Sequence, residues 1–190
     1  MEYIGEHIGR KVFWWHYSAE TLEELPEKNW ICFAIEDGLQ EGEMLEKFVR
    51  ISVKKNILEF KAFGKQSSKL DDFFDGVVVL MEVVENYSET NIMTTWHDSE
   101  GLASAFWQCF HATCVSEVEN EDLTIVCFHL ENKSLKEDLS EVVVTALGIK
   151  KEKKALGYAV SSIGKKDLEQ KPENDIARLL NGKAPGVNIL

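Results

Sequence analysis

Long apolar runs are absent from this sequence. The longest obvious run, VVVLM at residues 77–81, is far shorter than the roughly 18 to 20 residues of a membrane helix. The first residues, MEYIGEHIGRKVFWW, also lack the basic stretch and following apolar stretch of a secretory signal. As written, the chain is therefore expected to stay in the cytoplasm and not to insert into a membrane by itself.

Basic residues are scarce, with 21 Lys and Arg against 33 Asp and Glu and a net charge of −12. Residues 141–190 hold nine basic and six acidic residues, a balance of +3, which leaves −15 for residues 1–140. Nucleic-acid binding needs clustered Lys and Arg, so the acidic part argues against that partner. The lysine cluster at 150–154 has no interleaved aromatic residues, and we interpret it as a solvated linker.

Motifs for metal binding and catalysis are weak. CFHATC contains Cys109, His111 and Cys114, and CFH contains Cys127 and His129. Thiolate and imidazole together suit zinc, but structural zinc sites usually show two close ligand pairs. The apolar neighbours favour buried, reduced cysteines instead, so we expect neither a metal nor a cofactor.

A possible catalytic base is His97 with Asp98 as its orienting acid, in TWHDSE. No G-x-S-x-G, reactive-cysteine or metal motif supplies the reacting partner. Asp98 is more simply interpreted as the cap of the following helix. The sequence therefore predicts a protein that is not an enzyme.

The first 131 residues predict a compact mixed α+β domain with antiparallel hairpins and two to three helices. Aromatic and β-branched residues predict strands at 11–17 and 29–35. Strict alternation predicts a hairpin from 48–53 and 57–63. Apolar spacing favours helices in 68–88 and 99–112, and strands are expected at 91–96 and 123–130.

The adjacent tryptophans Trp14 and Trp15 lie on one predicted strand and must point to opposite faces of it. We expect one in the core and the other in an exposed contact patch for a partner.

The last 50 residues have a different pattern. EVVVTA at 141–146 is β-branched and predicts an extended segment that adds to the sheet edge of another protein. A strand is expected at 156–163. A helix after Pro172, a stop at Asn181 and Gly182, and a strand from Gly186 follow it.

SEVVVTALGIKKEKKALGYAVSSI and DIARLLNGKAPGVNI resemble the N-terminal plug of SusC/RagA-type TonB-dependent outer-membrane receptors. The resemblance covers residues 140–190. It implies a TonB box that pairs with the protein TonB, formed by Glu141, Val142, Val143, Val144, Thr145 and Ala146. It also implies a plug turn at Gly182, Pro185 and Gly186, and a place in the outer membrane or periplasm.

The expected organisation is therefore an acidic α+β domain at 1–131, a linker with the TonB-box-like strand at 132–155, and a truncated strand-helix-strand plug at 156–190. One hypothesis is a partial TonB-dependent receptor, which binds TonB but is not a complete transporter. The alternative is a cytoplasmic protein-binding module, immunity or antitoxin-like, whose acidic surface meets a basic protein. In that case the plug-like tail is a passenger.

Overall fold

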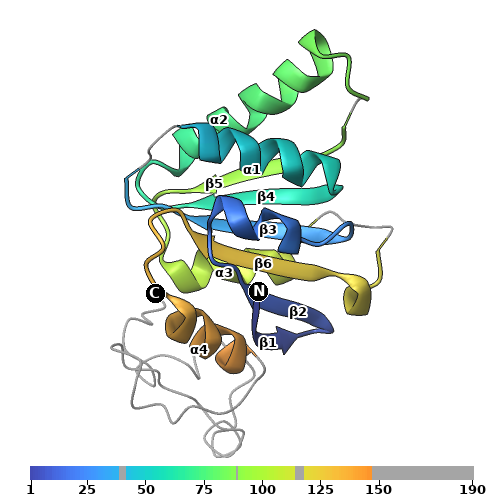
Figure 1. Cartoon of the computed structure of the whole chain (residues 1–190). Coiled ribbons are helices and arrows are strands. Elements are labelled where there is room, and N and C mark those ends of the chain that lie inside the picture. Colours follow the sequence, from blue (N-terminus) through green and yellow to red (C-terminus); the bar gives the residue numbers. More distant parts are fainter. Residues whose placement is uncertain (39–41, 89, 114–117, 147–190) are drawn as a thin grey trace, which may run out of the picture. The chain divides into compact units, whose positions relative to one another are not determined.

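The computed structural model describes residues 1–38, 42–88, 90–113 and 118–146 (Figure 1). The predicted plug at 156–190, with its turn residues Gly182, Pro185 and Gly186, lies outside these residues, as does Cys114. Within the described part, no helix has the length and apolar character to cross a membrane.

A six-stranded sheet forms the centre of the domain. Its strands are β1 (Glu2–His7), β2 (Arg10–Trp14), β3 (Trp30–Ile35), β4 (Ile57–Phe63), β5 (Met93–His97) and β6 (Thr124–His129). Their order is β1-β2-β6-β3-β4-β5, with β1 and β2 antiparallel and every other neighbouring pair parallel. The predicted mixed α+β class is confirmed.

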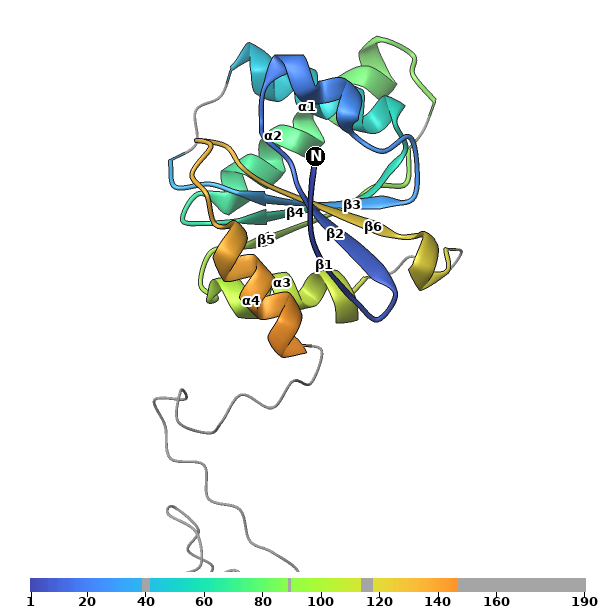
Figure 2. The same cartoon turned by 60° about the horizontal axis from the view of Figure 1, so that its bottom comes forward.

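Helices cover both faces of this sheet. They are η1 (Ala19–Glu24), α1 (Glu43–Lys54), α2 (Ser67–Val79), η2 (Leu80–Val84), α3 (Leu102–His111), η3 (Asn120–Asp122) and α4 (Lys136–Ala146). Figure 2 shows α1 and α2 on one side of the sheet and α3 and α4 on the other. Two separate apolar cores result, one under each layer of helices.

The order of the strands creates a topological switch point between the neighbouring strands β3 and β6. From β3 the chain runs outward through α1, β4, α2 and β5, then returns through α3 to place β6 between β2 and β3. β3 is followed by a helix on one face and β6 by a helix on the other. Such a switch point opens a crevice at the carboxyl ends of the two strands.

The predicted hairpin at 48–63 is wrong in its first half. Residues 48–53 belong to α1, and only 57–63 form a strand. Leu45, Phe48, Val49 and Val53 are buried at helical spacing, so the 3.6-residue period prevails over the alternation of residues 49, 51 and 53. The antiparallel hairpin is instead β1–β2, whose turn residues Ile8 and Gly9 have the positive φ values of 48° and 85° that a tight hairpin turn requires.

The expected exposed tryptophan is also wrong. Trp14 and Trp15 do point to opposite faces, but Trp14 packs in the core under α3 and α4 and Trp15 in the core under α1 and α2. Both are buried because both faces of β2 are covered by helices. Neither contributes an exposed contact patch.

Residues 141–146 are helical rather than extended. They form the second half of α4, in which Leu139 and Val143 are fully buried. These two residues lie one turn apart and face β1 and α3, so tertiary packing overrides the β propensity of the valines. The compact unit thus continues past residue 131, where the sequence places a linker.

Candidate functional site

Apolar side chains at the end of α2 are exposed to solvent. The inward side of this helix carries Leu70, Phe74, Val77 and Met81, which are buried against the sheet. Phe74 stacks on Phe60 of β4 with 4.2 Å between ring centroids and 15° between planes. This spacing confirms the predicted helix and leaves the opposite side of its second half turned away from the core.

That opposite side is apolar too. We define the α2 apolar surface as the exposed side chains of Val79, Leu80, Val83, Val84 and Tyr87. Val83 is 73% exposed and Val84 is 65% exposed. Residues 79 and 83, and residues 80 and 84, are four apart and therefore adjacent on the helix. A surface helix usually has one apolar side, which faces the core, and a polar side, which faces solvent. A second, solvent-exposed apolar side on the same helix is therefore unusual.

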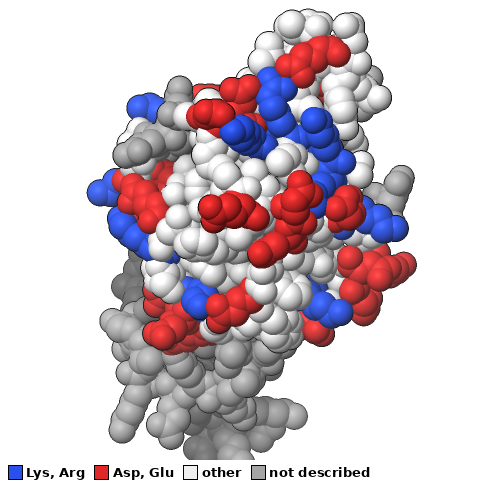
Figure 3. All heavy atoms as spheres, viewed as in Figure 1, with Lys and Arg blue, Asp and Glu red and all other residues white. Residues whose placement is uncertain are grey.

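The helix end that carries this surface extends past the edge of the sheet. Figure 1 shows it in green, pointing away from the strands, and Figure 3 shows the same projection as mostly uncharged. Its last turn, η2, is a π-helix in which the Glu85 N–H donates to the Leu80 carbonyl at 3.2 Å. Short π-helical turns occur frequently at functional sites.

Polar contacts hold this end in place. The backbone N–H and the hydroxyl of Thr90 donate to Glu82 at 2.6 and 2.7 Å, and these hydrogen bonds lower the pKa of Glu82. Arg50 of α1 bridges Glu85 at 2.8 Å and Glu46 at 2.8 Å. The carboxylates beside the surface are therefore engaged within the domain, and the helix end is tied to α1 and to the chain that leads into β5.

A second group of polar residues lies at the carboxyl ends of the parallel strands. His129 at the end of β6 lies 3.5 Å from Asp37, and Asp37 accepts a 2.6 Å contact from Lys133. Glu36, just after β3, is 1% exposed and accepts a hydrogen bond from the Gln66 N–H. Sequence reasoning missed this grouping because it depends on the strand order, although Glu36 and Asp37 directly after one predicted strand and His129 near the end of another were visible signals.

The predicted pair of His97 and Asp98 is replaced by another arrangement. His97 Nδ1 lies 3.3 Å from Glu100 Oε1, and Gln108 donates to the same carboxylate. The cap assignment of Asp98 is wrong, because α3 begins after Gly101 and has no side-chain cap. Glu100 also accepts from the Ser104 hydroxyl at 3.2 Å, which places an acidic group beside the first turn of α3.

The described cysteines lie in the core, as the sequence predicts. Cys32, Cys109 and Cys127 are fully buried, and burial raises the pKa of each thiol, to about 12 for Cys109. Thiols in this state are poor nucleophiles and poor metal ligands at neutral pH. In the ranges that the structure describes, no three His, Cys, Asp or Glu residues gather as a metal site.

The residues assigned to TonB binding lie apart from the α2 apolar surface. Glu141, Val142, Val143, Val144, Thr145 and Ala146 all fall in α4, on the opposite face of the sheet from α2. Pairing with a partner as a strand would require α4 to unwind and Val143 to leave the core.

Together these features define an acidic α+β domain with a mainly parallel sheet, helices on both faces and an uncovered apolar surface at the end of α2. The chain belongs to the family described as Domain of unknown function (DUF7684), whose model matches residues 12–146. The match runs from β2 to the end of α4 and so includes residues 141–146. A search of curated proteins finds no match.

Proposed function

We propose that the protein is a protein-binding module, without catalytic activity, that engages its partner through the α2 apolar surface. The observation that carries this proposal is the exposure of four apolar side chains on a helix end, with Tyr87 just beyond it, that the domain itself holds in place. Exposed apolar patches of this kind mark interaction sites in soluble proteins. A helix that presents residues at i, i+1, i+4 and i+5 fits an apolar groove on another protein.

Charge indicates the kind of partner. Residues 1–140 carry a balance of −15, so a second copy of the chain would be repelled while a basic protein would be attracted. The partner we propose therefore has an apolar groove with a basic rim. Its association should weaken as salt rises, because the attraction between the two surfaces is screened.

Binding to TonB is the other function that the sequence predicts, and it stays a prediction. The α2 apolar surface supports the protein-binding proposal more directly, because it is exposed without any unfolding. The residues 141–146 become available to a partner strand only at the cost of α4.

The test replaces one valine of the surface by a charged residue. Val83→Glu places a carboxylate at the centre of the α2 apolar surface, and Tyr3→Glu makes the same change at a more than half-exposed apolar side chain on β1. Both chains and the wild type are used to capture partners from cells that encode the protein. The captured protein is then purified and titrated against all three chains.

We expect Val83→Glu to weaken the titrated affinity by about a hundredfold, or nearly 3 kcal/mol, because a hot-spot contact is lost and a charge is buried. Tyr3→Glu should bind like the wild type. Equal affinity of the Val83 and Tyr3 variants would refute the proposed surface. A wild type that dimerises through Val83 in light scattering would instead identify a second copy as the partner.

A further inference from the structure

The strand β5 forms one edge of the sheet (Figure 1). Its inner side pairs with β4 in parallel, and on that side the N–H of Gly64 donates to the His97 carbonyl at 3.1 Å. Because backbone groups alternate in direction along a strand, the N–H and C=O groups of Thr94 and Trp96 point away from the sheet. Within the described part of the chain, no turn, loop or side chain forms a hydrogen bond with these four groups. The edge of β5 is therefore open.

The two edges of the sheet are protected differently. β1, at the opposite edge, has a shifted register between Tyr3 and Gly5, and Val143 of α4 packs over it. Bulges and covering helices of this kind prevent unwanted pairing. β5 pairs with β4 without a register shift and contains neither lysine nor proline, the residues that commonly block an edge. An edge in this state is suited to accept a strand from another protein.

Exposed apolar side chains accompany the open edge. Trp96 is 55% exposed and Met93 is 40% exposed. The register pairs Trp96 with Ala62, which belongs to the core under α1 and α2. Trp96 therefore lies on the α2 face of the sheet, and a strand added beside β5 would place its own side chains next to the Trp96 ring.

Carboxylates of α2 lie beside the same edge. Asp75 accepts a hydrogen bond from the Thr94 hydroxyl at 3.2 Å, and Asp71, one turn earlier on the helix, lies near Thr94 as well. Asp71 is only 4% exposed, and its Oδ1 atom is buried without a hydrogen-bond partner. Burial, and then the charge of Asp75, raise the pKa of Asp71 to about 6. A cation at this edge would stabilise the ionised carboxylate, which no basic side chain of the described residues does.

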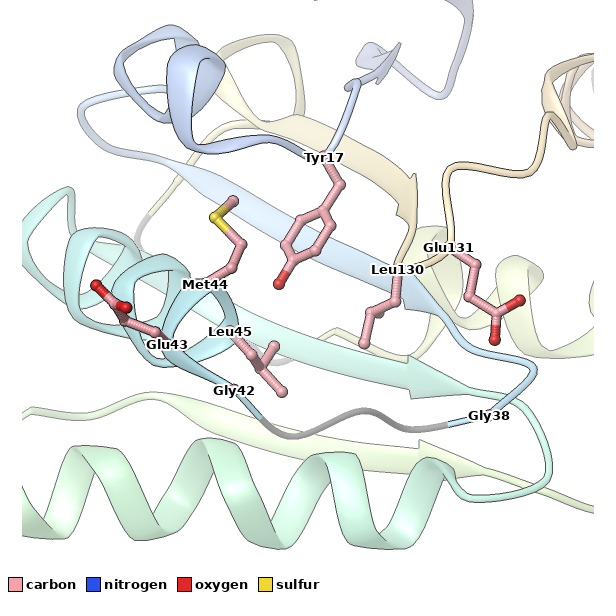
Figure 4. A pocket seen from close by; sticks show the side chains of 8 residues that line it. All are labelled: Tyr17, Gly38, Gly42, Glu43, Met44, Leu45, Leu130 and Glu131. Carbon is pink, nitrogen blue, oxygen red and sulfur yellow. The ribbon is translucent and has the colours of Figure 1, made fainter.

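The pocket at the switch point between β3 and β6 differs in this respect. It is lined mainly by apolar side chains, and the carboxylates of Glu43 and Glu131 point away from its centre (Figure 4). Glu43 forms an ion pair with Lys47. Glu131 forms an ion pair with Lys133. A basic ligand thus finds unpaired acidic groups at the edge of β5 and not in this pocket.

We propose that β5 accepts an extended basic peptide of another protein as an additional strand of the sheet. The peptide backbone bonds to the outward groups of Thr94 and Trp96, and a lysine or arginine side chain of the peptide lies close to the Trp96 ring and to the carboxylates of Asp71 and Asp75. The balance of −15 in residues 1–140 attracts such a peptide and repels a second copy of the chain. This edge is separate from the α2 apolar surface, and the proposal does not depend on the function proposed for that surface.

Three hexapeptides, all acetylated and amidated, test the charge and the strand form. The first alternates lysine and valine, the second alternates glutamate and valine, and the third has three lysines followed by three valines. Each is titrated by calorimetry into the full chain. We expect the alternating lysine peptide to bind about tenfold or more tighter than the other two, because only this peptide has both the charge and the two-residue period of a strand. Its affinity should fall as salt rises.

Two tryptophans provide a matched pair of variants. Trp96 and Trp107 are 55% and 50% exposed, and Trp107 lies on α3, on the other face of the sheet. Trp96→Ala should weaken the alternating lysine peptide by about tenfold, whereas Trp107→Ala should leave its affinity unchanged. Asp75→Asn should weaken it several-fold, and Asp122→Asn, which removes the same charge from η3, should not. Thermal unfolding checks that all four variants fold.

Amide hydrogen exchange shows where the peptide binds. The peptide should slow exchange at Thr94 and Trp96, whose N–H groups point outward, and leave Thr95 and His97, whose N–H groups face β4, unchanged. Absence of binding at low millimolar concentration overturns the proposal, as do equal losses in the two tryptophan variants or binding without slower exchange at Thr94 and Trp96. A chain that dimerises in light scattering, and no longer does so as Trp96→Ala, would identify a second copy as the source of the added strand and would also overturn it.

Discussion

At the scale of single residues, the junction of Glu36 and Gly64 is the most tightly constrained point of the sheet. Gly64 has a φ of 134°, and a Cβ there would lie 2.0 Å from the Glu36 backbone oxygen. Glu36 in turn donates its N–H to the Phe63 carbonyl at 2.9 Å and accepts from the Gln66 N–H with its side chain. Only glycine lets the end of β4 and the start of α2 approach β3 this closely.

Gly64→Ala is therefore expected to lower the free energy of unfolding by roughly 2–4 kcal/mol, because both the backbone conformation and the contact with Glu36 are lost. Gly76→Ala is the control. Gly76 lies inside α2 with nothing within 4 Å of an added Cβ, so alanine should stabilise the chain by about 0.5–1 kcal/mol. Urea unfolding of both variants measures the two effects, and destabilisation of equal size would contradict the assigned contact.

Single residues also show where sequence patterns are reliable. The burial of Cys32, Cys109 and Cys127 could be predicted, because each is surrounded by apolar residues in a strand or on a helix face. The burial of both Trp14 and Trp15 could not, because strand alternation says nothing about whether the second face is covered. The partner of His97 was missed for a similar reason: Glu100 is brought back to it by the turn into α3.

At the scale of elements, α4 packs closely against the edge strand β1. Val143 of α4 packs directly over Gly5 of β1, where an added Cβ would lie 2.8 Å from Val143 Cγ1. The stiff, fully buried valine cannot move aside as a long side chain could. Gly5 thus sets the distance at which α4 closes the second core.

Because of this contact, Gly5→Ala should destabilise the chain by about 1–3 kcal/mol through overpacking. Val143→Ala alone should cost about 2 kcal/mol through the cavity that it leaves. The double variant should lose less than the sum of the two, with a coupling of about 1 kcal/mol, since the smaller side chain makes room for the new methyl group. Strict additivity in urea unfolding would show that the two residues do not contact each other.

Elements differed in how well the sequence predicted them. The 68–88 helix and the strands at 29–35, 57–63 and 123–130 carry long, consistent patterns. The structure has the three strands, and it has the helix as far as Val84. The segment 48–53 fits both the two-residue period of a strand and the 3.6-residue period of a helix. Only the longer pattern that begins at Leu45 identifies it as a helix. For 141–146 the local β propensity was real, but the core that holds α4 is built from residues far away in the chain.

At the scale of the whole molecule, α4 carries the folded domain past residue 131. Its buried residues Leu139 and Val143 complete the core under α3, which also contains Val12, Phe33 and Phe106. A chain that stops at residue 131 would leave this core open to water.

We expect a chain of residues 1–146 to unfold cooperatively, and a chain of residues 1–131 to lose about 3–6 kcal/mol of stability through the two missing side chains alone. Thermal unfolding followed by near-ultraviolet circular dichroism distinguishes the two chains through the buried tryptophans. Equal melting temperatures would place the domain boundary back at residue 131, where the sequence expectation put it.

The position of β6 has a consequence for how the protein is made. Among the strands of the described residues, β6 is synthesised last, yet it lies between β2 and β3. Until Thr124–His129 has left the ribosome, the nascent chain holds two strands with unpaired inner edges. Such edges readily pair with other chains. The sheet can therefore close from its middle only after residues 124–129 have emerged from the ribosome, and a chain stopped earlier carries the gap with it.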